Sequence, residues 1–217
     1  MNKITVIGAG AWGTALAQTA TKNGASVTIW VREPELVGAI NGQHRNTLYL
    51  PDVLLNEKIT ATNDLNTCLD GAEAVLLTVP AQFLRSICKQ LSAVWPQGLP
   101  AVVCAKGIEQ KTGELMSEML AETLPQAPLA LLSGPTFAEE VALEKPTLVT
   151  LACADEALGK KLVETLGTST FRPYYTPDIV SVQIGGAVKN VMAIAAGIVA
   201  GKQLGDNARA ALITRGL

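Results

Sequence analysis

The chain of 217 residues has little of what metal proteins, nucleic-acid-binding proteins and membrane proteins depend on. It has one histidine, His44, and four scattered cysteines without the spacing of a metal site, so we expect no metal and reduced core thiols. Lysine and arginine number 17 against 19 acidic residues, which leaves no basic surplus for a nucleic-acid backbone. The longest apolar run, residues 191–201, is shorter than the roughly 20 residues of a membrane helix.

The first residues also lack a charged leader, a long apolar stretch and a cleavage site, so we expect a cytoplasmic protein. What is present is an apolar fraction of 48% with only 17% charged residues, which suits a sizeable core and argues against disorder. At about 100–200 residues per domain, the length allows one large domain, or one domain and part of a second.

Short apolar runs alternate with longer amphipathic stretches over most of the chain. The runs predict strands over residues 3–7, 26–31, 74–79, 101–105, 129–132 and 147–152, with a final extended segment over 168–174. The stretches between them predict helices over residues 12–23, 34–40, 82–94, 112–124, 136–143 and 155–166. This alternation favours an α/β fold, a doubly wound parallel sheet with helices on both faces.

The alternation ends near residue 177. Thr176 as N-cap and Pro177 at the first helical position predict a long helix over residues 178–200, and no strand follows it. We therefore place a domain boundary there, with residues 1–177 as one domain and residues 178–217 as the first helices of another.

The first strand runs into a glycine loop, Gly8-Ala9-Gly10-Ala11-Trp12-Gly13, which opens a helix. Gly8 permits a tight turn, Gly10 lets the backbone approach a pyrophosphate, and Gly13 lets the helix pack close to the strand. The N–H groups at the helix start favour phosphate. The loop therefore predicts a Rossmann-type dinucleotide site, with a loop needed only for packing and a Rossmann-type methyltransferase as alternatives.

The end of the second strand bears on the choice of dinucleotide. Arg32 could pair with a 2′-phosphate or stack on adenine, while Glu33 could accept a hydrogen bond from a ribose 2′-hydroxyl. We favour NADP(H), with NAD(H) tolerated. The alternative for Arg32 is a solvated surface charge.

Three further strand ends should lie at the same edge of the sheet, where ligands bind in open α/β folds. Val79-Pro80 ends one strand, Lys106-Gly107 another, and residues 133–139 end a third and open a helix. We expect the N–H groups and hydroxyl around Thr136 to face a small anionic substrate, although its spacing from Glu139 also fits a helix cap. Lys106 has a surface lysine as its alternative reading.

Lys189 is the only charged residue between Ile179 and Gly201. Among apolar neighbours an amine loses solvation, which favours its neutral form and lets it accept a proton near pH 7. Gly185-Gly186 would clear one helical turn, so that a substrate or another backbone can come close. With a nicotinamide to take a hydride, Lys189 would be the base that oxidises a secondary alcohol. The alternative is a lysine on an exposed stripe of an otherwise buried helix.

Five stretches carry a family resemblance: VIGAGAWGTALA (residues 6–17), AKGIE (105–109), SGPTFA (133–138), GGAVKNV (185–191) and GDNARAALITRGL (205–217). They resemble the bacterial-type NAD(P)-dependent glycerol-3-phosphate dehydrogenases. The resemblance implies interconversion of glycerol 3-phosphate and dihydroxyacetone phosphate, feeding phospholipid synthesis. The oligomeric state stays open, with a homodimer as one possibility. It implies cofactor contacts from Ala11, Trp12, Arg32, Lys106 and Ala138. It implies substrate contacts from Lys106, Gly134, Thr136 and Lys189, with Lys189 as proton acceptor.

The chain departs from the family pattern in three ways. Ala11 stands where the family often has serine, and Ala200 where an acidic residue is usual. The family also continues past the position of Leu217 through a helical substrate domain, so we expect a truncated chain that binds cofactor, turns over poorly and self-associates through its apolar helix. A 3-hydroxyacid or 6-phosphogluconate type dehydrogenase and a non-catalytic NADP(H)-binding module remain alternatives.

Overall fold

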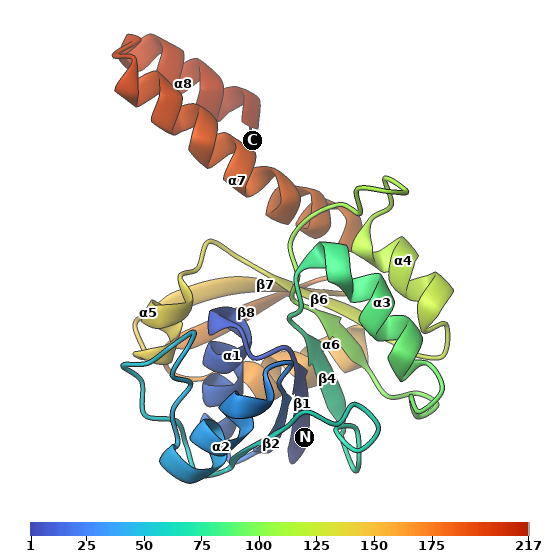
Figure 1. Ribbon diagram of the computed structural model, residues 1–217. Helices are drawn as coiled ribbons and strands as arrows, with labels where there is room; N and C mark the ends of the chain where they lie inside the picture. The colour runs from blue at the N-terminus through green and yellow to red at the C-terminus, as the bar shows by residue number, and fades with distance from the viewer. Residues whose placement is uncertain (217) are drawn as a thin grey trace.

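A computed structural model describes residues 1–216 and centres on one eight-stranded sheet (Figure 1). The strand order is β3-β2-β1-β4-β5-β6-β7-β8. The strands are β1 (Lys3–Ile7), β2 (Ser26–Trp30), β3 (Ile59–Thr62), β4 (Ala74–Leu77), β5 (Ala101–Val103), β6 (Leu129–Ser133), β7 (Thr147–Cys153) and β8 (Phe171–Thr176). The order reverses beside β1, as in doubly wound folds, so the predicted fold class is confirmed.

The helices alternate with these strands until β8 and then follow one another. They are α1 (Ala11–Lys22), α2 (Pro34–Gln43), α3 (Ala81–Leu91), α4 (Met116–Thr123), α5 (Ala138–Ala142), α6 (Glu156–Leu166), α7 (Ile179–Gly201) and α8 (Gly205–Gly216). Apolar residues of α1, α2, α5 and α6 pack with one face of the sheet, and those of α3 and α4 with the other. Helices therefore cover both faces, as predicted.

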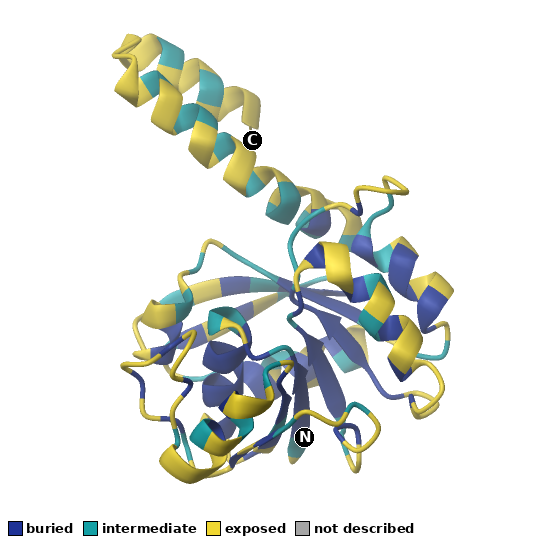
Figure 2. Ribbon diagram, in the orientation of Figure 1, coloured by how far each residue is buried: buried dark blue, intermediate teal, exposed yellow. Residues whose placement is uncertain are grey.

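Consecutive strand residues divide between the two faces because side chains alternate along a strand. Val6 and Leu76 belong to one apolar cluster, and their neighbours Ile7 and Leu77 belong to the other. The central strands are therefore buried on both sides, which explains their continuous apolar sequences (Figure 2). The four cysteines are buried and unpaired, as predicted.

The sheet departs from the prediction at β7, which pairs antiparallel with β6, whereas the other neighbouring strands are parallel. The register places Thr150 opposite Ser133. The middle of β7 therefore lies beside the carboxyl end of β6, and its first residues extend past that end.

Several predicted element boundaries were wrong. The edge strand β3 was missed because its four residues offer only a brief alternation of buried and exposed positions. The helix expected from residue 112 begins at Met116. Asp178, not Thr176, caps α7, because its carboxylate accepts a hydrogen bond from Ser181 N at 3.0 Å. Likewise α5 begins at Ala138, and Thr136 does not cap it.

Helices α7 and α8 form a hairpin that projects away from the sheet (Figures 1 and 2). Gln183 is the one fully buried residue of α7, and Val191 and Ile194 are 63% and 66% exposed. Helix α7 is therefore not largely buried, which contradicts the alternative of a lysine on an exposed stripe of an otherwise buried helix. With 23 residues and a mean hydropathy of 1.6 over its most apolar window, α7 is also long and apolar enough to cross a membrane. Run length therefore does not by itself exclude a membrane helix, because the apolar run is interrupted at Lys189 and Asn190 while the helix continues through both.

Candidate active site

The carboxyl ends of four parallel strands meet along one edge of the sheet. Ile7 pairs with Leu77, Leu77 with Val103, and Val103 with Leu131. The segments that follow these residues therefore emerge side by side: the glycine loop, Thr78-Val79-Pro80, the loop bearing Lys106, and Ser133-Gly134. Two clefts lie at this edge, one on the glycine loop and one on α7.

The glycine loop has the backbone geometry expected of a phosphate loop. Gly8 has a φ of 113°, which confirms the predicted turn, and a Cβ there would lie 3.0 Å from Thr78 Oγ1. A Cβ on Gly13 would overlap the carbonyl oxygen of Gly8. A Cβ on Gly10 would meet nothing within 4 Å, so the space above Gly10 is open.

Two side chains from elsewhere in the chain hold this loop in place. Thr78 Oγ1 donates to the carbonyl oxygen of Gly8 at 2.8 Å. The buried amide of Asn46 donates to the carbonyl oxygen of Ala9 and to Thr14 Oγ1, both at 2.7 Å. Neither residue was predicted, because both act on the loop across long sequence separations.

The cleft on the glycine loop has a volume of about 420 Å³. It is lined by Gly8, Ala9, Gly10, Ala11, Trp12, Trp30, Arg32, Glu33, Tyr49, Thr78, Val79, Pro80, Phe83, Ser86 and Ile87. The structure therefore brings Arg32 together with the loop residues, as the sequence predicted, and adds the aromatic side chains of Tyr49 and Phe83.

Arg32 is 74% exposed at this cleft and pairs with Glu33 at 2.6 Å. This hydrogen bond raises the pKa of Arg32. Burial tends to raise the pKa of Glu33, but the bond from Arg32 outweighs it together with other hydrogen bonds, including one from Tyr49 Oη at 3.2 Å, and the pKa is lowered. Glu33 is thus ionised at neutral pH and holds the guanidinium at the cleft.

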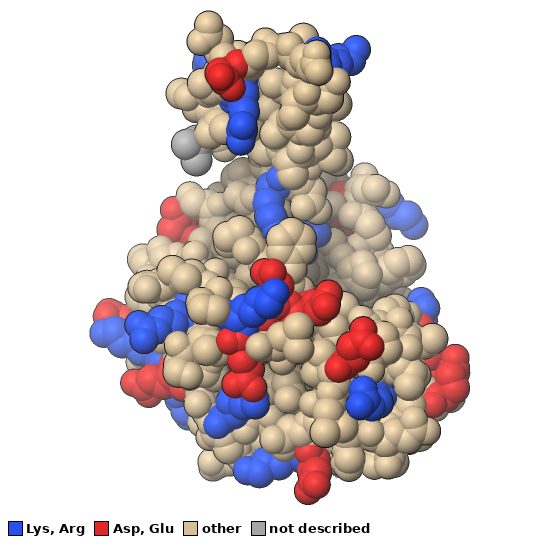
Figure 3. All heavy atoms as spheres, turned by 90° about the vertical axis from the view of Figure 1, so that its left-hand side faces the viewer, with Lys and Arg blue, Asp and Glu red and all other residues tan. Residues whose placement is uncertain are grey.

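The second cleft, of about 500 Å³, lies between the ends of β6 to β8 and the first half of α7. It is lined by Ser133, Gly134, Pro135, Thr150, Thr176, Asp178, Ser181, Val182, Gly185, Gly186 and Lys189. Figure 3 shows lysine or arginine atoms at the narrow part of the molecule where the projecting helices join the sheet region. Most of the surface of the projecting helices is uncharged in this view.

Lys106 and Lys189 come together at the edge of this cleft: Lys189 lines it, and Lys106 lies in an adjoining small pocket that shares Ser133 and Gly186 with it. Lys106 Nζ donates to the carbonyl oxygen of Gly134 at 2.8 Å. Burial, and then the nearby charge of Lys189, lower the pKa of Lys106. The amine of Lys189 lies 5.9 Å from the ring centre of Phe137. Two amines that repel each other favour a negatively charged ligand between them.

The predicted glycines of α7 have different surroundings. A Cβ on Gly186 would lie 2.8 Å from Ser133 Oγ, whereas a Cβ on Gly185 would meet nothing within 4 Å. The lack of a side chain at Gly186 therefore allows α7 to approach β6, and the lack of one at Gly185 leaves the cleft open. Both observations agree with the expectation that the two glycines leave room beside this helical turn.

Four predicted site residues do not line either cleft: Gly13, Lys106, Thr136 and Ala138. Gly13 packs against Gly8 below the loop, and Lys106 lies beside the second cleft in a small pocket of its own. Thr136 is half-buried, and its N–H donates to the carbonyl oxygen of Gly134 at 3.1 Å. Ala138 is half-buried and packs on the apolar core.

Sequence reasoning gave no site role to several residues that line the second cleft, namely Thr150, Thr176, Asp178, Ser181 and Val182, or to several that line the first, namely Trp30, Tyr49, Thr78, Phe83, Ser86 and Ile87. Ser133 stood in a noted motif without an assigned role.

The sequence matches two family descriptions that cover most of its length. Residues 3–159 match the N-terminus of NAD-dependent glycerol-3-phosphate dehydrogenase, and residues 178–217 match its C-terminus. The chain belongs to this family. The predicted resemblance is therefore confirmed.

Curated relatives agree with this assignment. Glycerol-3-phosphate dehydrogenase [NAD(P)+] of Rhodospirillum rubrum is 58% identical over 217 residues, which are all of this chain and 62% of the relative. The enzyme of Paramagnetospirillum magneticum is also 58% identical, over all of this chain and 78% of the relative. The chain thus spans about three fifths to four fifths of the length of these two relatives.

Solved structures of the family share the fold. The crystal structure of glycerol-3-phosphate dehydrogenase from Coxiella burnetii matches with a TM-score of 0.91 and 37% identity, over 99% of this chain and 66% of that one. The yeast enzyme matches with a TM-score of 0.90 and 32% identity, over 99% of this chain and 67% of that one.

Proposed function

We propose that the protein is an oxidoreductase that interconverts sn-glycerol 3-phosphate and dihydroxyacetone phosphate with NAD(P)(H), in the cytoplasm. The observation that carries this proposal is that Lys106 and Lys189, from different elements, lie close together, with Lys189 lining the second cleft and Lys106 bonded to Gly134 at its edge. Two ammonium groups suit a substrate that carries a phosphate.

The glycine loop fits a dinucleotide. The space above Gly10 is open, and no side chain caps the N-terminus of α1, so its first N–H groups are free for a pyrophosphate. Gly8, Gly10, Ala11, Trp12, Gly13 and Arg32 would hold the cofactor, with Lys106 and Ala138 nearer the substrate. When bound, its nicotinamide supplies the hydride acceptor.

On the substrate side, Lys106, Gly134, Thr136 and Lys189 would bind the phosphorylated three-carbon ligand. Lys189 would take the proton of the secondary hydroxyl during oxidation and return it to the ketone oxygen in reverse. In this proposal residues 1–177 form the dinucleotide-binding domain, and residues 178–217 provide the first helices of the substrate domain.

The test compares Lys189→Met with Lys202→Met, which removes an exposed lysine just past the end of α7. NADPH binding is followed by fluorescence, and dihydroxyacetone phosphate binding by calorimetry. We expect Lys189→Met to weaken dihydroxyacetone phosphate at least about tenfold, or about 1.4 kcal/mol, and to leave NADPH affinity unchanged. Lys202→Met should change neither.

Single-turnover oxidation of NADPH by dihydroxyacetone phosphate then separates the alternatives. An enzyme loses this reaction in Lys189→Met while keeping cofactor affinity. A nucleotide-binding module without catalysis would bind NADPH equally well in both variants and respond to dihydroxyacetone phosphate in neither. Equal ligand affinity in wild type and Lys189→Met would overturn the role of Lys189.

A further inference from the structure

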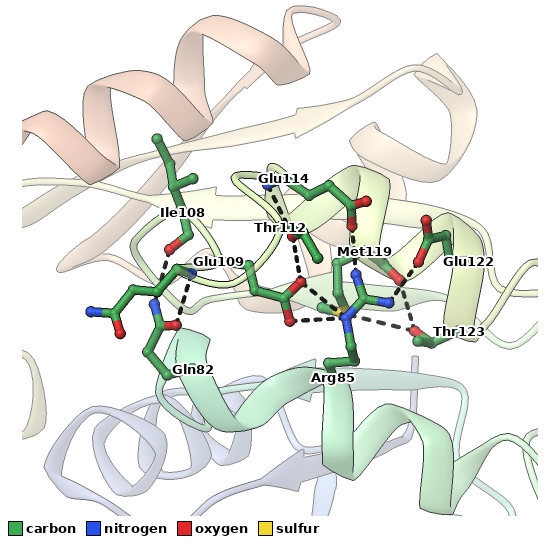
Figure 4. A network of polar contacts seen from close by, with 10 residues as sticks. Gln82, Arg85, Ile108, Glu109, Thr112, Glu114, Met119, Glu122 and Thr123 are labelled. Atoms are coloured by element: carbon green, nitrogen blue, oxygen red, sulfur yellow. Dashed lines mark hydrogen bonds and ion pairs between the residues drawn. The ribbon is translucent and has the colours of Figure 1, made fainter.

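Arg85, on α3, forms ion pairs with three carboxylates (Figure 4). Its partners are Glu109 at 2.9 Å, Glu114 at 2.5 Å and Glu122 at 2.6 Å. We call these four residues the Arg85 cluster. It lies outside both clefts, and none of its members has a role in the proposed reaction.

Glu109 is the buried member of the cluster. Its side chain is 8% exposed, against 55% for Glu122. Arg85 Nε donates to both of its oxygens, at 2.9 and 3.0 Å, and Thr112 Oγ1 donates to one of them at 2.7 Å. These bonds, first that from Arg85, lower the pKa of Glu109. The pair is thus a charged, fully bonded anchor rather than a loose surface contact.

The segment anchored in this way begins at Lys106. Directly after Lys106, Gly107 has a φ of 135°, and a Cβ there would lie 3.3 Å from Ala81 Cβ, at the start of α3. Gln82 Nε2 then donates to the carbonyl oxygen of Ile108 at 2.9 Å. Its Oε1 accepts from Gln110 N at 3.0 Å.

Three positions of α3, at residues 81, 82 and 85, therefore hold consecutive parts of one loop. On the other side of Lys106 the chain is held by the sheet, where Cys104 N donates to the carbonyl oxygen of Leu77 at 2.9 Å. Lys106 therefore lies between two segments that are both held in place, Cys104 before it and residues 107–110 after it. Its amine donates to the carbonyl oxygen of Gly134.

We propose that Arg85 and Glu109 are positioning residues, whose ion pair fixes the loop over residues 105–115 and so places the Lys106 amine at the edge of the substrate cleft. The identity of the substrate rests on the proposed function, but the placement of Lys106 does not. Gln82 supports the same placement through neutral hydrogen bonds.

The chain provides a matched control. Glu109→Gln and Glu122→Gln each remove one carboxylate charge from the same arginine. Glu122 lies on α4, outside the loop, and accepts from Arg85 Nη1 at 2.6 Å, so its loss leaves the loop anchored by Glu109 and Gln82. A merely structural role predicts similar effects of the two variants on the site, whereas a positioning role predicts an effect of Glu109→Gln alone.

The first measurement is the pKa of Lys106, from the pH dependence of its NMR signal after reductive ¹³C-methylation, with Lys106→Arg for assignment. In the wild type the pKa of Lys106 lies below its ordinary value of 10.5, because of burial and the charge of Lys189. In Glu109→Gln the loosened loop lets water reach the amine, so its pKa should move toward 10.5, while Glu122→Gln should match the wild type.

The second measurement is binding of dihydroxyacetone phosphate by calorimetry. We expect about tenfold weaker binding in Glu109→Gln and less than about twofold change in Glu122→Gln. Binding of 2′,5′-ADP, which matches the Arg32 end of the other cleft, should be unchanged in both and reports that the sheet is folded. If Glu109→Gln does not fold, Gln82→Ala, which removes two neutral bonds, should shift both readouts in the same direction by about threefold or less.

Identical Lys106 pKa and ligand affinity in Glu109→Gln and Glu122→Gln would overturn the positioning role. Failure of the wild type to bind dihydroxyacetone phosphate would instead overturn the proposed substrate. The comparison of Lys106 pKa values decides between the two cases, because it needs no ligand.

Discussion

The sheet with its covering helices and helix α7 of the hairpin are both apolar in sequence but differ in what surrounds their apolar side chains. The strands of the sheet lie between two layers of helices, whereas most large apolar residues of α7 are exposed (Figure 2). The comparison shows that an apolar sequence reports the capacity for burial, while packing partners decide whether burial occurs. Substitutions in the two regions should therefore differ sharply in effect.

Among substitutions at the candidate site, the largest effect is expected in the sheet region, at Gly13. In Gly13→Ala the new Cβ overlaps the carbonyl oxygen of Gly8 and lies 2.5 Å from Thr78 Oγ1, so α1 must move away from the sheet. We expect a loss of about 3 kcal/mol, or a Tm lower by about 10 °C. Differential scanning calorimetry measures this.

Gly10→Ala is the control for that variant, since its Cβ meets nothing within 4 Å. Its Tm should stay within about 2 °C of the wild type, while NADPH binding weakens because the methyl group occupies the space above the loop. A similar Tm for both variants would contradict the packing role of Gly13.

A smaller effect is expected where the two regions meet. Gly185→Ala gains helix propensity without a contact, and its Tm should rise by about 2–4 °C. Gly186→Ala gains the same propensity but places a Cβ 2.8 Å from Ser133 Oγ, so its Tm should not rise. Thermal unfolding of the two variants side by side checks the contact between α7 and β6; an equal rise would refute it.

At the exposed rim of the sheet region, a substitution should alter binding but not stability. Arg32→Ala removes a guanidinium that is 74% exposed and bonded only to Glu33. We expect about tenfold weaker binding of NADPH, a smaller loss for NADH, and an unchanged Tm. Fluorescence titration with both cofactors measures the ratio, and an equal loss for NADPH and NADH would contradict a 2′-phosphate contact.

The smallest effect is expected in the outer part of the hairpin. Ile194→Gln replaces a side chain that is 66% exposed, so the free energy of unfolding should change by less than about 0.5 kcal/mol. Leu76→Ala, at a fully buried position of β4, should cost about 2–5 kcal/mol in the same urea titration. A large loss in Ile194→Gln would show that this face is covered in solution.

Features encoded in local spacing were predictable from the sequence. The glycine loop, the central strands and the order of elements follow from turn chemistry and from short apolar runs. The carboxyl ends of parallel strands meet at one edge of the sheet, and from this we predicted that Lys106 and Gly134 lie close together, which the structure shows. Lys189 was singled out by composition alone, and it does line the cleft, although its helix is exposed rather than buried.

Features that depend on long-range pairing were not predictable. The antiparallel direction of β7, which brings Thr150 to the cleft, leaves no trace in a run of apolar residues. The supports of the site, Asn46 and Thr78 under the glycine loop and Arg85 beside the Lys106 loop, act across 24 to 70 residues of sequence. Such contacts depend on the tertiary fold, and the periodicity of apolar residues in the local sequence does not predict them.

The strand order has a consequence for how the sheet is made on the ribosome. β1 leaves the ribosome first and lies in the interior of the sheet, next to β2 on one side and β4 on the other. After β3 completes one edge, each strand from β4 to β8 docks beside one that has already been synthesised. Because chains begin to fold from the N-terminus during synthesis, the sheet can grow outward without waiting for a later strand.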